Sequence, residues 1–257
     1  MNDKILNPNL HNPHFNDDPI LSLKGNTGIL LLHGFTATPF EVRNLADFFI
    51  NKGFSVSAPT LAGHGTKPED MLTIHWEDWL QTGEKGYAQL SDHCDNIFVG
   101  GESTGAVVSL LMAAHHPEIA GILAYSPAMQ LPLKSFEQLA VHLLSKVWKF
   151  SPKNDLEGNT TWQGYRVNPI NGVKQLLKLE KETIKQLEAI TQPVLVFLGG
   201  EDKTIDLTSG DIVMDGVSSQ YKKKHFYPNA EHCILLGDDF EEVADISLKF
   251  ILEHNSQ

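Results

Sequence analysis

Short apolar runs alternate with longer amphipathic stretches along most of this chain. Residues 28–32 form an uninterrupted run that leads into His33 and Gly34, which is typical of a strand buried on both faces of a sheet. A capping box of Thr38 and Glu41 is expected to start the first helix. Further strands are expected at 54–58, 97–99, 121–125, 194–198 and 224–227, and helices at about 38–52, 75–91, 104–115 and 239–252. This alternation predicts an α/β fold with a mostly parallel central sheet and helices on both faces.

The order of the segments predicts a core that is interrupted once. Residues 1–17 are rich in Asn, Asp, His and Pro and are expected to form a loose N-terminal arm. Residues 128–191 show helical spacing, for example from Phe136 to Phe150, and no convincing strand, so we expect a helical cap there. Residues 18–127 and 192–257 would then form the core. The cap carries more Lys and Arg than Asp and Glu, and this excess is typical of helix faces exposed to solvent. Contact of these basic residues with anionic groups is the alternative interpretation.

Charge and composition exclude several classes of protein. The 257 residues carry 20 Lys and Arg against 32 Asp and Glu, a formal net charge of −12. Such a chain is repelled by phosphate backbones, so nucleic acid is not an expected partner. No apolar run reaches the roughly 18 residues of a membrane span, and the polar N-terminus does not resemble a signal peptide, so a cytoplasmic protein is expected. Cys94 and Cys233 follow no disulfide or metal-ligand pattern, and no cofactor is implied.

A candidate nucleophile lies in Gly101-Glu102-Ser103-Thr104-Gly105, between an expected strand and the helix that follows it. In this setting a G-x-S-x-G motif holds the serine on a strained turn with its hydroxyl above the sheet. The flanking glycines allow the strand and the helix to approach each other. Ser103 is therefore the predicted nucleophile, and an ordinary glycine-rich turn with a capping serine is the alternative.

Such a serine needs a base within hydrogen-bond reach and an acid that orients the base. Asp202 lies in the first turn after the strand at 194–198, and His232 lies in the loop after the strand at 224–227. Because the carboxyl ends of parallel strands share one edge of a sheet, we expect both residues near Ser103. Glu201 and Asp206 are the alternatives for the acid.

The oxyanion that forms on attack needs two N–H donors in fixed positions. Thr104, which follows the nucleophile, is expected to provide one donor. Phe35, in the loop after the first buried strand, is expected to provide the other, and its ring can line the acyl pocket or simply pack in the core. His33 and His64 adjoin glycines and are expected to hold loops by hydrogen bonds.

With these residues the chain resembles an α/β-hydrolase of the small bacterial carboxylesterase and monoacylglycerol lipase group, from about residue 26 onward. The resemblance rests on His33-Gly34-Phe35-Thr36, Gly63-His64-Gly65, Gly101-Glu102-Ser103-Thr104-Gly105, the Asp202 turn and the His232 loop. It implies a catalytic triad of Ser103, Asp202 and His232, with Phe35 and Thr104 as oxyanion donors. Glu102 departs from the pattern, since many relatives carry an apolar residue beside the nucleophile.

The expected function is that of a serine hydrolase that cleaves short-to-medium acyl esters or monoacylglycerols through an acyl-enzyme. On the same fold, lysophospholipase activity and the hydrolysis of amide, thioester or carbon–carbon bonds are the alternatives. A binding protein without activity is a further alternative, against which an intact Ser, Asp and His argue. The expected partner is a small ester substrate, and the sequence predicts no oligomeric state.

Overall fold

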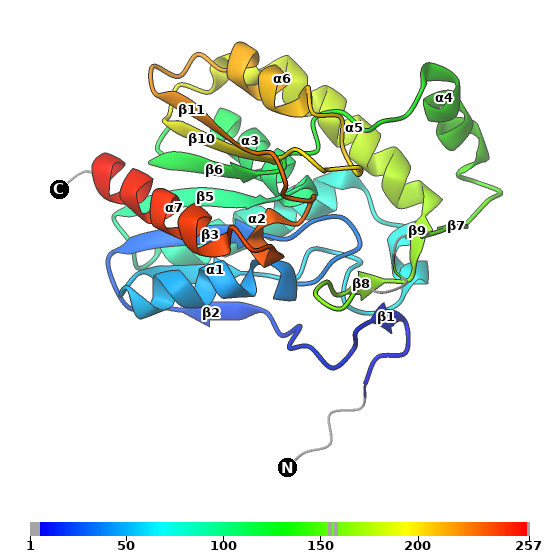
Figure 1. The fold of residues 1–257 in the computed structure, drawn as a ribbon, viewed down its shortest axis with the longest axis horizontal. Helices are drawn as coiled ribbons and strands as arrows, with labels where there is room; N and C mark the ends of the chain where they lie inside the picture. Colours follow the sequence, from blue (N-terminus) through cyan, green and yellow to red (C-terminus); the bar gives the residue numbers. More distant parts are fainter. Residues whose placement is uncertain (1–5, 154–155, 157–158, 256–257) are drawn as a thin grey trace.

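A seven-stranded sheet is the centre of the computed structural model, which describes residues 6–153, 156 and 159–255 (Figure 1). The strand order is β11-β10-β6-β5-β3-β4-β2, and within this sheet β2 alone runs antiparallel to its neighbour. The predicted α/β class with a mostly parallel sheet is confirmed. The strands are β2 (Ile20–Ser22), β3 (Thr27–Leu32), β4 (Ser55–Ala58), β5 (Asn96–Glu102), β6 (Gly121–Tyr125), β10 (Val194–Gly199) and β11 (Lys222–Tyr227).

Helices cover both faces of the sheet, as predicted (Figure 1). Side chains alternate along β3, so that Leu30 and Leu32 are buried in one apolar cluster while Ile29 and Leu31 are buried in the other. The first cluster lies against α2 (Trp76–Ser91), α3 (Thr104–His115), α5 (Ile170–Gln186) and α6 (Ser209–Gly216). The second lies against α1 (Phe40–Asn51) and α7 (Phe240–His254). Among the residues described, no helix is both long enough and apolar enough to cross a membrane.

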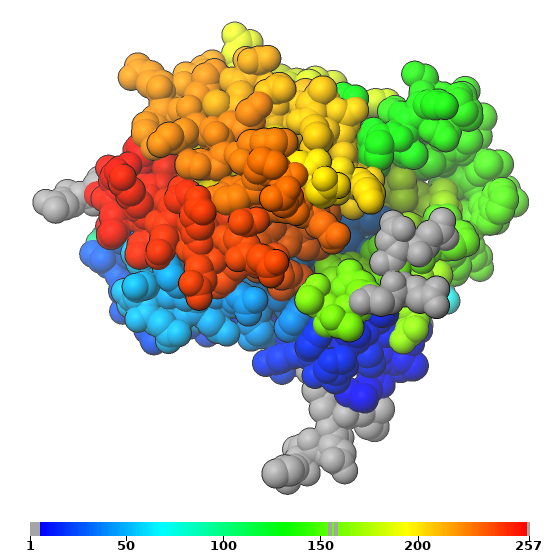
Figure 2. Space-filling view, in the orientation of Figure 1, coloured from blue at the N-terminus to red at the C-terminus, as the bar shows by residue number. Residues whose placement is uncertain are grey.

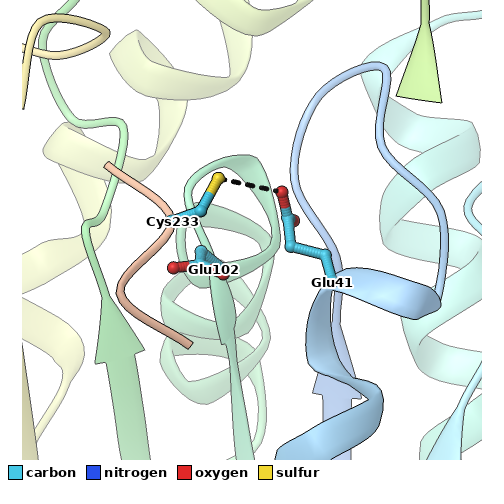
Figure 3. A group of neighbouring side chains, drawn as sticks. All are labelled: Glu41, Glu102 and Cys233. Carbon is cyan, nitrogen blue, oxygen red and sulfur yellow. Dashed lines mark hydrogen bonds between the residues drawn. The ribbon is translucent and has the colours of Figure 1, made fainter. Parts of the chain in front are cut away.

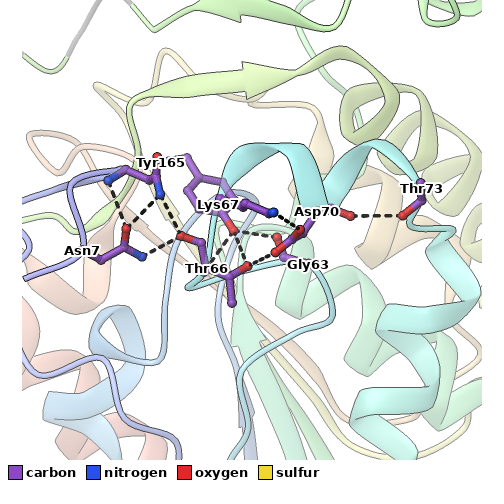
Figure 4. Close-up of polar contacts among 8 residues, drawn as sticks. Asn7, Gly63, Thr66, Lys67, Asp70, Thr73 and Tyr165 are labelled. Atoms are coloured by element: carbon purple, nitrogen blue, oxygen red, sulfur yellow. Dashed lines mark hydrogen bonds and ion pairs between the residues drawn. The ribbon is translucent and has the colours of Figure 1, made fainter. Parts of the chain in front are cut away.

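The N-terminal segment is fixed to the rest of the molecule, so the expectation of a loose arm at 1–17 is wrong from residue 6 onward; residues 1–5 lie outside the described residues. Strand β1 (Leu10–His11) pairs antiparallel with β8 (Gly164–Tyr165) of the cap, and Leu10 is fully buried. The Asn7 side-chain amide donates hydrogen bonds to two backbone carbonyls of the loop at residues 63–66 (Figure 4). The Tyr165 hydroxyl of the cap donates to the Gly63 carbonyl at 2.8 Å. The N-terminal segment, the cap and the loop at residues 63–66 are therefore joined by hydrogen bonds.

The cap at 128–191 contains short strands as well as helices, which corrects the expectation that it holds no strand. The helix α4 (Ser135–Leu144) ends six residues before Phe150, which lies in β7 (Phe150–Pro152) and pairs with β9 (Val167–Pro169). No residue of α4 is buried, and this helix protrudes from the molecule (Figure 2). Large apolar side chains are exposed on α4 and the turn after it: Phe136, Leu139, Leu143, Val147 and Trp148. The α5 helix, in contrast, contributes buried leucines to the core.

Short 3-10 helices occur between these elements. They are η1 (Pro68–Leu72), η3 (Leu187–Ala189) and η4 (Ile234–Leu236). The last of them begins two residues after His232, and its Ile234 and Leu235 are buried in the second apolar cluster.

Candidate active site

Ser103 lies on a strained turn between β5 and α3. Its backbone angles are φ 57° and ψ −116°, and a positive φ is uncommon for a residue with a Cβ. The neighbouring strand β6 helps to hold this conformation, because the Ser103 N–H donates to the Tyr125 carbonyl at 2.9 Å. A Cβ on Gly101 or on Gly105 would overlap the Leu32 carbonyl oxygen of β3. The two glycines of the motif therefore allow α3 to start directly against the sheet, with the serine at its N-terminus.

His232 and Asp202 form a hydrogen-bonded pair after β11 and β10. The Nδ1–H of His232 donates to Asp202 Oδ2 at 2.6 Å, and the Asp202 side chain is fully buried. The other oxygen, Oδ1, accepts the N–H groups of Thr204 at 2.8 Å and Ile205 at 3.1 Å. A carboxylate held in this way fixes the tautomer of the ring, so Nε2 is left to accept a proton.

The two alternative acids do not contact His232. Asp206 accepts the N–H of Thr208 at 2.9 Å and its hydroxyl at 2.6 Å, and these bonds lower the pKa of the Asp206 carboxyl. Its acceptor atom is therefore engaged in the turn before α6. Glu201 is exposed. The structure thus brings Asp202, and neither alternative, to the histidine.

The loop after β3 lies against the serine. A Cβ on Gly34 would lie 3.1 Å from Ser103 Cβ, which places the backbone before Phe35 beside the nucleophile. Within the described residues, no backbone hydrogen bond of this loop uses the Phe35 N–H. Thr104 is the first residue of α3, where an N–H has no partner inside the helix. Among the described residues, both N–H groups predicted to bind the oxyanion therefore lack a backbone acceptor and can donate to a ligand.

The ring of Phe35 also contacts the cap. A Cβ on Gly172, in the first turn of α5, would lie 2.6 Å from the ring carbon Cε2 of Phe35. Phe35 is only partly buried, whereas Thr36 beside it is fully buried. The cap helix α5 therefore packs against the Phe35 ring of the loop after β3.

His33 and His64 hold loops, as expected from the sequence. The Nδ1–H of His33 donates to the Gly34 carbonyl at 2.9 Å, and Nε2 accepts the Leu61 N–H at 3.0 Å. Burial lowers the pKa of His33 to about 4. His64 contacts the Ala62 carbonyl at 3.1 Å, and burial lowers its pKa well below the usual value. Both rings are therefore neutral at neutral pH, and His33 helps to shape the turn that precedes Phe35.

A buried acidic cluster beside this site is only partly visible in the sequence (Figure 3). One carboxyl oxygen each of Glu41 and Glu102 and the Cys233 sulfur lie within 4.8 Å of one another. The sequence marked Glu102 as unusual, but it assigned Glu41 to a capping box. That assignment is wrong, because Pro39 is the N-cap of α1 and the Glu41 side chain does not bond back to Thr38, although the Thr38 hydroxyl accepts the Phe40 N–H at 3.4 Å. Instead Glu41 accepts hydrogen bonds from the Gly34 N–H at 2.5 Å and the Trp162 indole N–H at 3.0 Å.

The cluster holds atoms that can ligate a metal, but burial opposes the negative charge that metal binding would require. Burial raises the pKa of both carboxyl groups and, well above the usual value, that of the Cys233 thiol. Metal binding needs the thiolate. Both oxygens of Glu41 already accept N–H groups of the protein. A thiol with a raised pKa and a carboxylate with both oxygens engaged make this cluster a weak ligand set.

Known proteins resemble this chain over nearly its whole length. The family model described as serine aminopeptidase, S33, matches residues 26–239. A thermostable monoacylglycerol lipase of Bacillus sp. strain H-257 is 33% identical over 92% of this chain and 95% of its own. A carboxylesterase of Bacillus subtilis strain 168 is 29% identical over 88% of this chain and 93% of its own. A solved structure reported for LipS and LipT, two metagenome-derived lipolytic enzymes, is 26% identical, with a TM-score of 0.88 over 97% of this chain and 100% of that one.

Proposed function

Since the chain belongs to the serine aminopeptidase S33 family of α/β-hydrolases, we propose that it hydrolyses carboxylic esters through an acyl-enzyme formed on Ser103. One observation carries this proposal. A serine on a strained strand–helix turn lies at the same sheet edge as a hydrogen-bonded histidine–aspartate pair. The relatives named as monoacylglycerol lipase and carboxylesterase support an ester as the substrate rather than another acyl compound.

The proposed first step is acylation. His232 Nε2 accepts the proton of the Ser103 hydroxyl as its oxygen attacks the ester carbonyl. Asp202, whose carboxyl group accepts three hydrogen bonds, stabilises the imidazolium that results. The N–H groups of Phe35 and Thr104 bind the oxyanion, while His232 returns the proton to the leaving alcohol. Water, activated by the same histidine, then releases the acid.

We propose short-to-medium acyl esters and monoacylglycerols as the substrate class. The cap helix α5 packs against the Phe35 ring, beside the proposed oxyanion donor, and we expect a cap in this position to hinder the entry of bulky triacylglycerols. A pocket with an apolar wall favours longer acyl chains by up to about 0.8 kcal/mol for each methylene that it buries. The proposal includes no cofactor and no nucleic-acid partner, and a cytoplasmic location stays a prediction from the N-terminal sequence.

A panel of substrates tests this proposal. We would measure kcat/KM for p-nitrophenyl esters of graded acyl length, for monoacylglycerols and triacylglycerols, and for a lysophospholipid, with Ser103→Ala as the control. The expected result is a maximum at short or medium chains, activity on monoacylglycerols and none in the variant. Activity that survives in Ser103→Ala contradicts the acyl-enzyme, and a preference for the lysophospholipid reassigns the substrate.

Peptide or other amide bonds are the second candidate, because the family description names an aminopeptidase. An aminopeptidase has to bind the α-ammonium group of its substrate. Both oxygens of Glu41 already accept N–H groups, and burial raises the pKa of Glu102 well above its usual value, so these carboxyl groups offer little to such a cation. Aminoacyl p-nitroanilides in the same panel distinguish ester hydrolysis from peptide hydrolysis. A kcat/KM for an anilide that exceeds the value for every ester would favour the peptidase.

A further inference from the structure

Glu41 lies directly behind the loop that we propose binds the oxyanion (Figure 3). Its Oε2 accepts the Gly34 N–H at 2.5 Å. A Cβ placed on Gly34 would lie 2.9 Å from this same oxygen and 3.1 Å from the Ser103 Cβ. The backbone of Gly34 is thus held between the carboxyl group of α1 and the nucleophile, one residue before Phe35.

The second oxygen of Glu41 joins this loop to the cap. Oε1 accepts the indole N–H of Trp162 at 3.0 Å, and Trp162 is 7% exposed. Lys153, also of the cap, lies 3.9 Å above the Trp162 ring and donates to the Thr36 hydroxyl at 2.6 Å. The cap therefore contacts the oxyanion loop at several points, and one of these connections passes through Glu41.

The contacts of the two carboxyl groups show which one carries the charge. Glu41 accepts from two N–H groups and from the Cys233 thiol, at 3.6 Å. Glu102 accepts the Leu235 N–H at 3.3 Å, and its buried Oε2 has no partner among the described residues. Two carboxyl groups this close do not both ionise. The proton therefore belongs on Glu102 and the charge on Glu41. Burial raises the pKa of both carboxyl groups, but that of Glu102 well above its usual value.

The charged and titratable groups around Glu41 come from several elements. Glu102 of β5 and Cys233 of the loop after β11 lie within the cluster itself. Burial raises the pKa of Glu41, and the charge of a protonated His232 partly offsets this rise. Farther out, Asp202 acts on Glu102, and Lys153 of the cap acts on Cys233. Since the interaction with His232 is mutual, an ionised Glu41 stabilises the imidazolium that forms during attack on the ester.

We propose that Glu41 is a positioning residue, which holds the oxyanion loop against Ser103 and joins it to the cap through Trp162. The proposal rests on the function proposed above. An oxyanion donor contributes only when it is held in place before the reaction. The charge-assisted bond from the Gly34 N–H to Glu41 fixes the backbone from which the Phe35 N–H projects.

Three variants test this proposal: Glu41→Gln, Glu102→Gln as the matched neutral control, and Trp162→Phe. The measurements are kcat and KM for p-nitrophenyl butyrate across the pH range, the fraction of active serines titrated with a fluorophosphonate, and the Tm. For Glu41→Gln we expect kcat to fall about 10- to 100-fold, while KM stays within about threefold of the wild-type value. This loss is smaller than the roughly 10²- to 10³-fold fall in kcat that follows removal of a whole oxyanion donor. The acid limb of kcat/KM should also move to lower pH, because a negative charge facing His232 is removed.

The controls separate positioning from folding. Glu102→Gln should keep kcat within about threefold and leave the acid limb in place, because Glu102 is already neutral. Trp162→Phe should lower kcat by less than Glu41→Gln does. Three results would each overturn the proposal. The first is an unchanged kcat in Glu41→Gln, and the second is a fall in its kcat that is fully explained by a smaller fraction of active serines. The third is a fall in kcat of the same size in Glu102→Gln.

Two further outcomes are informative. If Glu41→Gln does not fold, Trp162→Phe carries the test, and a wild-type kcat in that variant overturns the link to the cap. Ser103→Ala is assayed beside these variants. Activity that survives in Ser103→Ala shows that the proposed function has failed, whereas its loss together with an unchanged Glu41→Gln shows that only the positioning proposal has failed.

Discussion

Replacing Glu180 by glutamine should stabilise the protein, and the gain should depend on pH. Glu180 lies on α5 and is 6% exposed, and its buried Oε1 has no hydrogen-bond partner among the described residues. Burial raises the pKa of this carboxyl from 4.5 to about 8, with a partial offset from Lys181. The folded protein thus holds a carboxyl that resists ionisation, and glutamine has nearly the same shape without the charge.

The magnitude follows from the two pKa values. When the pKa of an acid is higher in the folded state than in the unfolded state, the protein loses stability as pH rises from the lower pKa to the higher one. The loss is about 1.4 kcal/mol for each pH unit in that range. The wild-type free energy of unfolding should therefore fall as pH rises from 4.5 to about 8. At pH 7 the penalty is about 3 kcal/mol, which glutamine removes. The Tm of a chain of this size should rise by roughly 5–10 °C.

Urea unfolding at pH 4.5, 7 and 8 measures this effect. Glu180→Gln should match the wild type at the lowest pH and exceed it increasingly at the higher ones. Glu182→Gln is the control two residues away, because Glu182 already pairs with Lys185 at 2.9 Å and gains nothing by losing its charge. A gain for Glu180→Gln that is equal at all three pH values, or that is absent at pH 8, would refute the reasoning.

The remaining predictions concern the catalytic groups. Ser103→Ala, His232→Ala and the double variant should lose about the same kcat, because the two residues act as one unit; a further thousandfold loss in the double variant contradicts this. Asp202→Asn should lower kcat by about 10⁴ while Asp206→Asn changes it little, and the opposite ranking would reassign the acid. The kcat/KM should rise with pH through the neutral region, because a protonated His232 cannot accept the serine proton; a rate that stays flat from about pH 5 to pH 8 argues against a histidine base.

Much of the fold and the candidate site could be predicted because each signal is local. The apolar run that forms β3 is long enough to identify a buried strand. The motif at Ser103 has the strand and helix that it requires on either side. Asp202 follows β10 within three residues, so its position at the sheet edge follows from the strand itself.

The rest depends on contacts between residues far apart in the sequence. Glu41 and Trp162 are separated by 121 positions, and the local pattern at Glu41 favoured a capping box instead. Strands of two residues, such as β1 and β8, are too short to show any periodicity. The helical spacing continues past Leu144 to Phe150, but pairing of β7 with β9 takes precedence over it there.

The two ends of the cap are held by different numbers of contacts, so the free energy needed for local opening differs between them. At the end near the oxyanion loop, the β1–β8 pairing, the bond from the Tyr165 N–H to the Thr36 carbonyl and the Trp162–Glu41 bond must all break before that part can separate. The α4 helix at the other end buries no side chain. Local opening therefore requires the least free energy at α4, and thermal fluctuation can widen the outer rim of the cap while the groups around Ser103 keep their positions.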